Sequence, residues 1–151
     1  MQNLELYYSL AIDTLKKLIN TPSLSGKENE AASIIEKLLH QYHFQTHRSH
    51  HNVWAFSKDY KADRPTLLLN SHLDTVKPSK QWSKDPFKAE LVGAKLFGLG
   101  SNDAGASLVS LLAVFLALED TEQSYNRVFV ASAEEEISGV LLKGIDTGYN
   151  W

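Results

Sequence analysis

Apolar residues recur along the first third of the chain at the spacing of two amphipathic helices. The first pattern runs from Tyr8 to Ile19 and ends at Thr21-Pro22, and the second runs from Ala31 to Tyr42. Between them, Ser25-Gly26-Lys27-Glu28 has the form of a capping box, which predicts that this segment opens the second helix.

The rest of the chain alternates apolar strand-like runs with helical or hairpin patterns. Residues 53–56 and 127–133 predict strands, and the apolar run in 66–72 is typical of a buried central strand. Residues 87–97 predict a hairpin, and 103–118 predict a third helix that is apolar on most sides and lies deep against the sheet. This alternation predicts an α/β fold, a three-layer αβα arrangement with a mainly parallel sheet and helices on both faces.

Composition narrows the class of protein. The 151 residues are 43% hydrophobic and 22% charged, which is typical of one soluble globular domain. The net charge of −3, without a run of Lys or Arg, argues against nucleic acid as a partner. The N-terminal segment has no basic region of the kind that begins a secretory signal, and the longest apolar stretch falls short of the roughly 20 residues of a membrane span. We therefore expect a cytoplasmic protein without a membrane partner.

The absence of cysteine decides which ligands a metal would have. Disulfides and thiolate metal sites are excluded, so histidine and carboxylates must supply the donor atoms. His72 and Asp74 are two residues apart at the end of a predicted strand, and such residues point to the same side of an extended chain. This predicts a metal-binding imidazole oriented by a carboxylate. The alternative is a buried, hydrogen-bonded histidine with Asp74 in a turn.

Two further acidic segments lie at junctions between predicted elements, where open α/β folds place ligands. Asp103 ends the glycine-rich segment 98–103, and either binds metal or is the N-cap of the third helix. Residues 134–136 are three consecutive glutamates after an apolar strand. They either divide metal binding and proton transfer between them or form a solvated acidic edge.

Five histidines between residues 40 and 51 raise the alternative of a second metal site. His40 and His43 are at helical spacing, whereas His47, His50 and His51 lie in or after the following turn. A polar, partly exposed loop is the better interpretation of this segment.

Taken together, segments 71–76, 98–103 and 132–139 resemble the M20 family of zinc aminoacylases and peptidases in both order and spacing. Trp82 and Asp85-Pro86-Phe87, between the first two segments, also look familial. The branch of acetylornithine deacetylase and succinyl-diaminopimelate desuccinylase looks closest. The resemblance implies a zinc-exopeptidase-like catalytic domain with two zinc ions in its site, for which Co²⁺ is an expected substitute.

The resemblance also implies a role for each candidate residue. His72 would bind one zinc ion, Asp103 would bridge both, and Glu136 would bind the other. Asp74 would orient His72. Glu135 would accept a proton from the attacking water and return it to the departing amine.

The implied reaction is hydrolysis of the N-acyl amide bond of a small acylated amino acid. Acetylornithine, and with it arginine biosynthesis, is the first substrate expected from the resemblance. Succinyl-diaminopimelate and small peptides are the alternatives.

The chain also departs from the family pattern. Residues 1–139 resemble the N-terminal part of a catalytic domain, whereas 140–151 form an atypical tail that indicates a frameshift or an early stop. A later metal carboxylate, a late metal histidine and the lid domain that dimerises are expected to be missing. The incomplete domain leaves a second hypothesis open, an inactive fragment that binds metal weakly or binds only a partner chain, and self-association is one form of that hypothesis.

Overall fold

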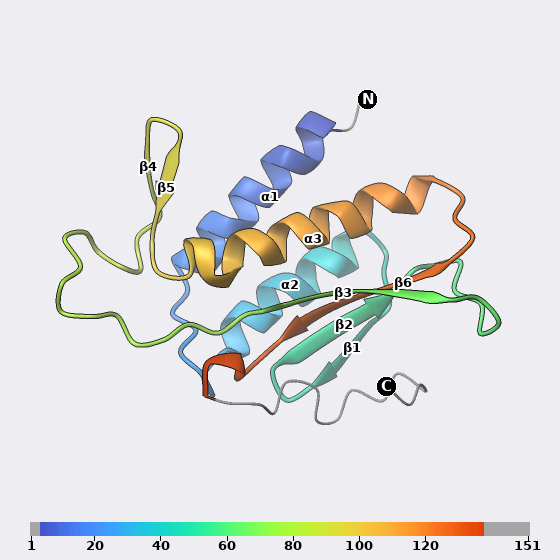
Figure 1. Cartoon of the computed structure of the whole chain (residues 1–151), viewed down its shortest axis with the longest axis horizontal. Coiled ribbons are helices and arrows are strands. Elements are labelled where there is room, and N and C mark those ends of the chain that lie inside the picture. Colours follow the sequence, from blue (N-terminus) through green and yellow to red (C-terminus); the bar gives the residue numbers. More distant parts are fainter. Residues whose placement is uncertain (1–3, 138–151) are drawn as a thin grey trace.

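The computed structural model describes residues 4–137. Its longer elements come in the order helix, helix, hairpin, strand, hairpin, helix, strand (Figure 1). They are α1 (Leu4–Ile19), α2 (Asn29–Gln41), β1 (Thr46–Ser49), β2 (Asn52–Phe56), β3 (Thr66–His72), β4 (Glu90–Val92), β5 (Lys95–Phe97), α3 (Ala106–Ala117) and β6 (Asn126–Ser132). Three short turns of helix, η1 (Ser101–Gly105), η2 (Leu118–Asp120) and η3 (Glu135–Ile137), complete the described chain. The predicted tail 140–151 lies outside these residues.

Four strands form one mixed sheet in the order β1-β2-β6-β3. β1 and β2 are antiparallel, β2 is antiparallel to β6, and β6 is parallel to β3. The sequence predicts a mainly parallel sheet, and the described sheet differs because of its first hairpin. Ser49 pairs with Asn52 across a two-residue turn, and such a turn joins only antiparallel strands.

All three helices lie on the same side of this sheet. α2 packs on β1 and β2, α3 packs on β3 and β6, and α1 packs on the other two helices (Figure 1). The main core between helices and sheet includes Ile35, Leu39, Val53, Ala55, Leu69, Leu112, Phe115, Phe129 and Ala131. The α/β class is confirmed, with the described helices on one face of the sheet and a smaller apolar cluster around Trp54, Val128 and Val130 on the other.

In the described sheet β6 is a fully buried interior strand, whereas β3 lies at an edge. Every residue of β6 is buried, whereas β3 has a single buried residue, Leu69, and Leu67 on it is 43% exposed. Among the described strands β3 pairs only with β6, which leaves its other edge without a neighbour. The apolar run of β3 therefore predicts the strand correctly but not its place in the sheet.

The third helix is shorter than its apolar pattern predicts. It begins at Ala106, because Asp103 and Ala104 have non-helical backbone angles within η1. Leu112 on its inner face is 1% exposed, whereas Val114 on its outer face is 46% exposed. Helix α3 thus lies deep against the sheet on one side only. The predicted hairpin in 87–97 is present as β4 and β5.

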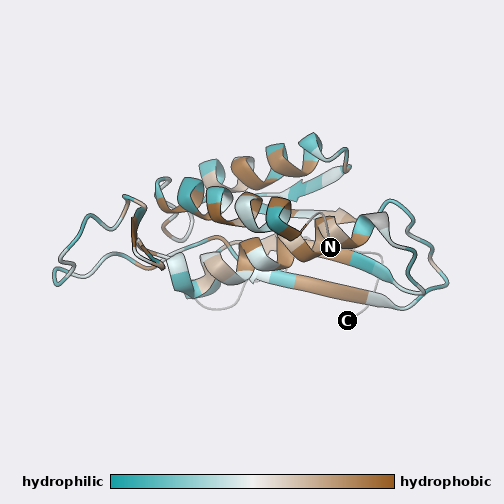
Figure 2. Cartoon of the chain, turned by 90° about the horizontal axis from the view of Figure 1, so that it is seen from above, coloured by the Kyte–Doolittle hydropathy of each residue, from teal (hydrophilic) through white to brown (hydrophobic). Residues whose placement is uncertain are grey.

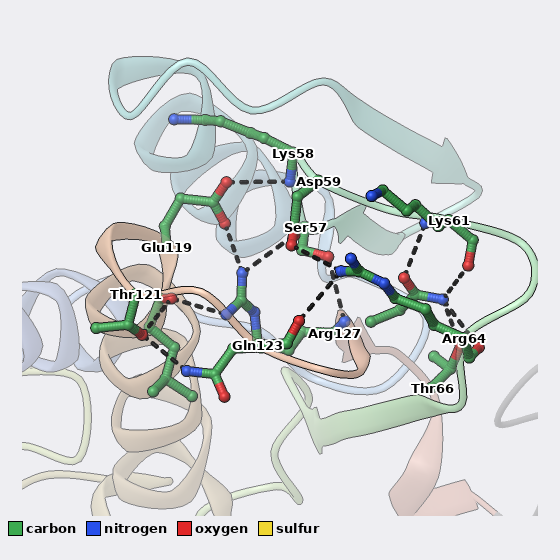
Figure 3. A network of polar contacts seen from close by, with 12 residues as sticks. Ser57, Lys58, Asp59, Lys61, Arg64, Thr66, Glu119, Thr121, Gln123 and Arg127 are labelled. Atoms are coloured by element: carbon green, nitrogen blue, oxygen red, sulfur yellow. Dashed lines mark hydrogen bonds and ion pairs between the residues drawn. The ribbon is translucent and has the colours of Figure 1, made fainter.

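A buried arginine fixes the start of β6 (Figure 3). The Arg127 side chain is 1% exposed and donates hydrogen bonds to the Leu118 carbonyl at 2.7 Å and to Glu119 Oε2 at 3.0 Å. Its backbone N–H donates to Ser57 Oγ at 3.2 Å. These contacts tie β6 to η2 and to the loop after β2. Because they lie at the end of β6 opposite to its last residue, we assign them to stability.

Loop 73–89 extends from one end of the molecule, beyond the last residue of β3 (Figure 1). The loops at both ends of the molecule are largely hydrophilic, in contrast to the apolar stretches of the helices and strands (Figure 2). Within residues 4–137, none of the helices has the length and apolar character that a membrane crossing requires.

Candidate metal centre

The predicted site residues meet where β3 and β6 end. These strands are parallel, and the last residue of β3, His72, pairs with the last residue of β6, Ser132. The chain therefore leaves both strands at the same edge of the sheet, and Asp74 follows on one side while 134–136 follow on the other. The η1 turn, which holds Asp103, contacts β3 at this edge.

Asp74 is the buried centre of this arrangement. It is 1% exposed, and its Oδ1 accepts a hydrogen bond from the Glu135 N–H at 3.1 Å. Its Oδ2 accepts from the Glu136 N–H at 3.0 Å and from Ser25 Oγ at 2.7 Å. Burial alone would raise the pKa of this carboxyl, but the hydrogen bonds from His72, Ser25 and the two amides outweigh it and lower the pKa to about 2.

His72 lies between two carboxylates. Its Nδ1 is 3.0 Å from the Asp74 carbonyl oxygen and 3.3 Å from Asp74 Oδ1, so this nitrogen carries a proton and donates it. Its Nε2 is 3.1 Å from Asp103 Oδ1. The hydrogen bond to the Asp74 carboxylate is the main cause that raises the pKa of His72 to about 9, against the effect of burial. With Nδ1 occupied, Nε2 is the nitrogen that faces a metal ligand position.

Two of the three glutamates join His72. Ligand atoms of His72, Glu135 and Glu136 all lie within 4.8 Å of one another, the one such group of three among residues 4–137. Burial and the negative charge of Asp103 raise the pKa of Glu136 above its ordinary value. An imidazole nitrogen and carboxylate oxygens in this proximity are a donor set that fits a divalent ion such as Zn²⁺. The proximity is compatible with the interpretation in which these glutamates divide metal binding and proton transfer, which stays a prediction.

Asp103 reaches the site from a glycine-rich turn. Its side chain is 79% exposed, and its Oδ1 contacts His72 Nε2 in the site. Gly100 has a left-handed φ of 73°, and a Cβ there would lie 2.6 Å from Thr75 Cγ2. The Gly105 N–H donates to the Gly100 carbonyl at 2.8 Å, which closes the turn behind Asp103. The alternative in which Asp103 is an N-cap is wrong, because α3 has Gly105 at that position and no side-chain cap.

The histidines at 40–51 have other partners. His40 Nε2 is 2.6 Å from Thr46 Oγ1, His47 stacks on Trp54, and His51 bonds to Glu28. In the part of the chain that the structure describes, they form no group of three metal ligands. The expected polar, partly exposed character is present, but the expected loop is not, because His47 lies on β1 and the segment forms the β1–β2 hairpin.

The sequence interpretation missed the contribution of segment 23–28 to the site. Ser25 donates to Asp74, and the Glu28 carboxylate is buried against the 134–136 turn. Neither side chain caps α2, whose N-cap position, Glu28, makes no side-chain cap hydrogen bond, so the predicted capping box is wrong. Ser25 and Glu28, on either side of Gly26-Lys27, were visible in the sequence before the helix. Their three-residue spacing is also that of a capping box, so the pattern did not distinguish the two roles.

The Asp74→Asn variant is expected to bind metal about ten- to a hundredfold more weakly than wild type. This is the usual effect of changing a residue that hydrogen-bonds to a metal ligand. The amide keeps the shape of Asp74 but removes the charge that raises the pKa of His72, and one of its atoms faces an N–H as a donor. The measurement is calorimetric titration with Zn²⁺, beside an NMR titration of His72. Asp63→Asn, at an exposed loop position, is the matched control. Unchanged affinity with an unchanged His72 pKa would contradict the assigned role.

The described residues thus form an α/β domain in which the ends of two parallel strands gather one histidine and several carboxylates. The family model described as Peptidase family M20/M25/M40 matches residues 68–148, more than half of the chain. The chain therefore belongs to this family.

Curated relatives cover nearly the whole chain. It is 31% identical over 139 residues to the succinyl-diaminopimelate desuccinylase of Wigglesworthia glossinidia brevipalpis, in a match that covers 85% of this chain and 35% of the relative. It is 29% identical over 142 residues to the enzyme of the same name from Blochmanniella pennsylvanica (strain BPEN), with 88% and 37% covered. The chain thus spans little more than a third of the length of these relatives.

Solved structures show the same fold. Human carnosine dipeptidase 1 superposes with a TM-score of 0.73 at 19% identity, covering 94% of this chain and 35% of that one. The dipeptidase Dug1p from Saccharomyces cerevisiae gives 0.74 at 21%, with 92% and 35% covered. The Bacillus subtilis YXEP protein, described as a dinuclear metal-binding peptidase of the M20 family, gives 0.66 at 20%, with 88% and 37% covered.

Proposed function

We propose that this site binds divalent metal, zinc first, and serves hydrolysis of the N-acyl amide bond of an acylated amino acid. The observation that carries the proposal is the convergence of His72, Glu135 and Glu136 within 4.8 Å, with the buried Asp74 behind them. Family membership and the names of the curated relatives support the same reaction class.

In this proposal His72, Asp103 and Glu136 hold the metal. His72 and Glu136 would each belong to one of two ions, and Asp103, next to His72 Nε2, would be shared between them. Metal ions in such a site lower the pKa of water and polarise the carbonyl of the substrate. Co²⁺ is expected to replace Zn²⁺, because imidazole nitrogen and carboxylate oxygen atoms bind both ions.

Asp74 and Glu135 have separate roles beside the proposed metal ligands. Asp74 holds the tautomer and orientation of His72 through Nδ1, and it holds the backbone of Glu135 and Glu136 through their N–H groups. Glu135 accepts the proton of the attacking water and passes it to the amide nitrogen as the C–N bond breaks. The products are a carboxylic acid and the free amino acid.

The substrate is narrowed by the relatives. The resemblance in the sequence favours acetylornithine, as in arginine biosynthesis, whereas the curated relatives reported above are succinyl-diaminopimelate desuccinylases. Both substrates carry an N-acyl group on an amino acid, so the proposal is made for that class, in amino-acid biosynthesis and in the cytoplasm. N-succinyl-diaminopimelate and N-acetylornithine are the first two to assay.

A second candidate function is metal or partner binding without turnover. It is favoured by the 79% exposure of the Asp103 side chain, a proposed metal ligand that is open to water. Among residues 4–137, the proposed ligands His72, Asp103 and Glu136 are three for two ions, whereas catalytic zinc usually has three for one. This candidate shares the metal site with the first and differs in affinity and turnover.

The deciding experiment is a calorimetric titration of the 151-residue chain with Zn²⁺, with His72→Ala beside it. The proposal expects binding of two ions that the variant loses, followed by release of free amine from either N-acyl substrate. His40→Ala, an exposed histidine away from the site, is the control. Binding without turnover would favour the second candidate, and equal binding by wild type and His72→Ala would overturn both.

A further inference from the structure

A second buried carboxylate, that of Glu28, contacts the glutamate turn that Asp74 also contacts. Its side chain is fully buried. Oε1 accepts hydrogen bonds from the Gly26 N–H at 2.8 Å and from the Glu134 N–H at 3.1 Å. Oε2 is 2.7 Å from His51 Nδ1. A charged group buried this completely requires partners, and these three contacts supply them.

The carboxylate is not used by the helix that it precedes. Glu28 occupies the N-cap position of α2, but its side chain makes no cap hydrogen bond there. Its bonds lead instead to the loop at Gly26, to the turn at Glu134 and to the hairpin at His51. A merely helix-capping role therefore does not account for its burial.

The backbone of Glu134, whose N–H donates to Glu28, has an uncommon conformation. Glu134 has a φ of 62°, in the left-handed region that residues with a side chain rarely adopt. Such a conformation persists only where the surroundings hold it. The Glu28 carboxylate holds the Glu134 N–H, and the next two N–H groups, of Glu135 and Glu136, are held by Asp74. Two buried carboxylates thus bind three consecutive amides.

We infer that Glu28, oriented by His51, is a positioning residue that sets the 134–136 turn so that Glu135 and Glu136 face His72. The inference deepens the proposed function and rests on it for the roles of these two glutamates. His51 stands to Glu28 as His72 stands to Asp74, an imidazole against a buried carboxylate. The difference is that neither Glu28 nor His51 belongs to the group of three possible ligands at His72.

The first test needs no metal. Amide hydrogen exchange of residues 134–136 is measured by NMR in wild type, Glu28→Gln and Glu28→Ala. Loss of the acceptor is expected to speed exchange of the Glu134 amide by about tenfold or more in Glu28→Ala, as local opening does, while β6 amides such as Val128 and Val130 change little. Glu28→Gln keeps an oxygen acceptor and is expected to remain close to wild type. Glu36→Ala, which removes a surface partner of Arg48 from α2, is the matched control.

The second test measures the binding of Co²⁺, with no substrate present, by calorimetry and by the visible absorption of the bound ion. Glu28→Ala is expected to bind Co²⁺ about ten- to a hundredfold more weakly and with an altered spectrum, and Glu28→Gln is expected to restore both. Should Glu28→Ala fail to fold, His51→Ala, which removes a partner whose side chain is 25% exposed, is expected to show the same local change to a smaller degree.

Each outcome has one meaning. Exchange that rises equally at residue 134 and in β6, or Co²⁺ binding by Glu28→Ala that equals wild type, overturns the inference. Local exchange at 134–136 together with weakened Co²⁺ binding supports it. If wild type binds no Co²⁺, the proposed function fails, and the exchange experiment alone decides whether Glu28 sets the turn.

Discussion

Glu135→Gln is expected to hydrolyse the N-acyl substrate about 10² to 10⁴ times more slowly than wild type, the usual contribution of a general base, while its metal affinity stays nearly unchanged. The backbone of Glu135 is held by the Asp74 carboxylate, so the amide side chain of the variant occupies the same position without the ability to accept a proton. Turnover is measured by release of free amine at saturating Zn²⁺, and metal affinity by calorimetry on the same preparation.

The neighbouring glutamates are the matched controls for this prediction. Glu136→Gln is expected to lose metal affinity, because Glu136 is the proposed ligand, and Glu134→Gln is expected to change neither quantity, because only its backbone N–H is used. Equal loss of metal by Glu135→Gln and Glu136→Gln would mean that both carboxylates bind metal and that the proton acceptor is another group. Full turnover in Glu135→Gln would remove the assignment altogether.

Local patterns in this chain predict elements well, because periodicity reports which side of an element is buried. The stripes at Tyr8–Ile19 and Ala31–Tyr42 are α1 and α2, and the run before His72 is β3. The same patterns do not report strand order. The apolar run of β3 predicts a central strand, whereas β3 lies at an edge of the described sheet and β6 is central. An apolar strand reads alike whether one or two strands pair with it, since pairing uses backbone atoms.

Some residues of the candidate site can likewise be predicted from the sequence, and one cannot. His72, Asp74, Glu135 and Glu136 stand out in the sequence because ligand-type residues follow predicted strands, and the structure places them together. Glu28 does not stand out, because its partner Glu134 is 106 residues away in sequence and is contacted through a backbone N–H. An acceptor that binds main chain leaves no trace in the identity of its partner.

The two buried carboxylates explain why the 134–136 turn is built as it is. Three adjacent glutamates repel one another, and their backbone N–H groups donate to two buried carboxylates. Asp74 and Glu28 accept those N–H groups, and the hydrogen bonds keep the pKa of Asp74 low even though the residue is buried. The negative side chains of Glu135 and Glu136 are thereby left to face His72. A cation at that place would offset the repulsion, which is a physical reason to expect metal affinity at this turn.

Metal affinity is expected to fall steeply as the pH is lowered from 9. In the metal-free chain the pKa of His72 is raised to about 9, so below that pH a proton occupies the nitrogen that a metal needs. Binding must displace that proton, so the affinity should fall about tenfold per pH unit, or about a thousandfold between pH 9 and pH 6. Titration with chelator-buffered Zn²⁺ over this range measures the slope.

The raised pKa of His72 makes the stability of the metal-free fold change with pH in the opposite direction to metal affinity. A raised histidine pKa stabilises the folded chain fully below the ordinary value of 6.5, and this contribution is lost as the pH rises through about 9. The melting temperature in the presence of a chelator is therefore expected to fall over the pH range in which metal affinity rises. Asp74→Asn, which removes the cause of the shift, should flatten both dependences.

Proton release during calorimetry separates the raised pKa from an ordinary one. At pH 7 a His72 with a pKa of about 9 releases nearly one proton per site when metal binds, whereas a histidine of ordinary pKa 6.5 releases about a quarter of a proton. Titrations in buffers of different ionisation enthalpy give this number directly. A release near a quarter, with affinity that is flat from pH 7 to 9, would show that Asp74 does not hold His72 in its charged form. The pairing of these two residues would then have to be reassigned to the metal-bound state alone.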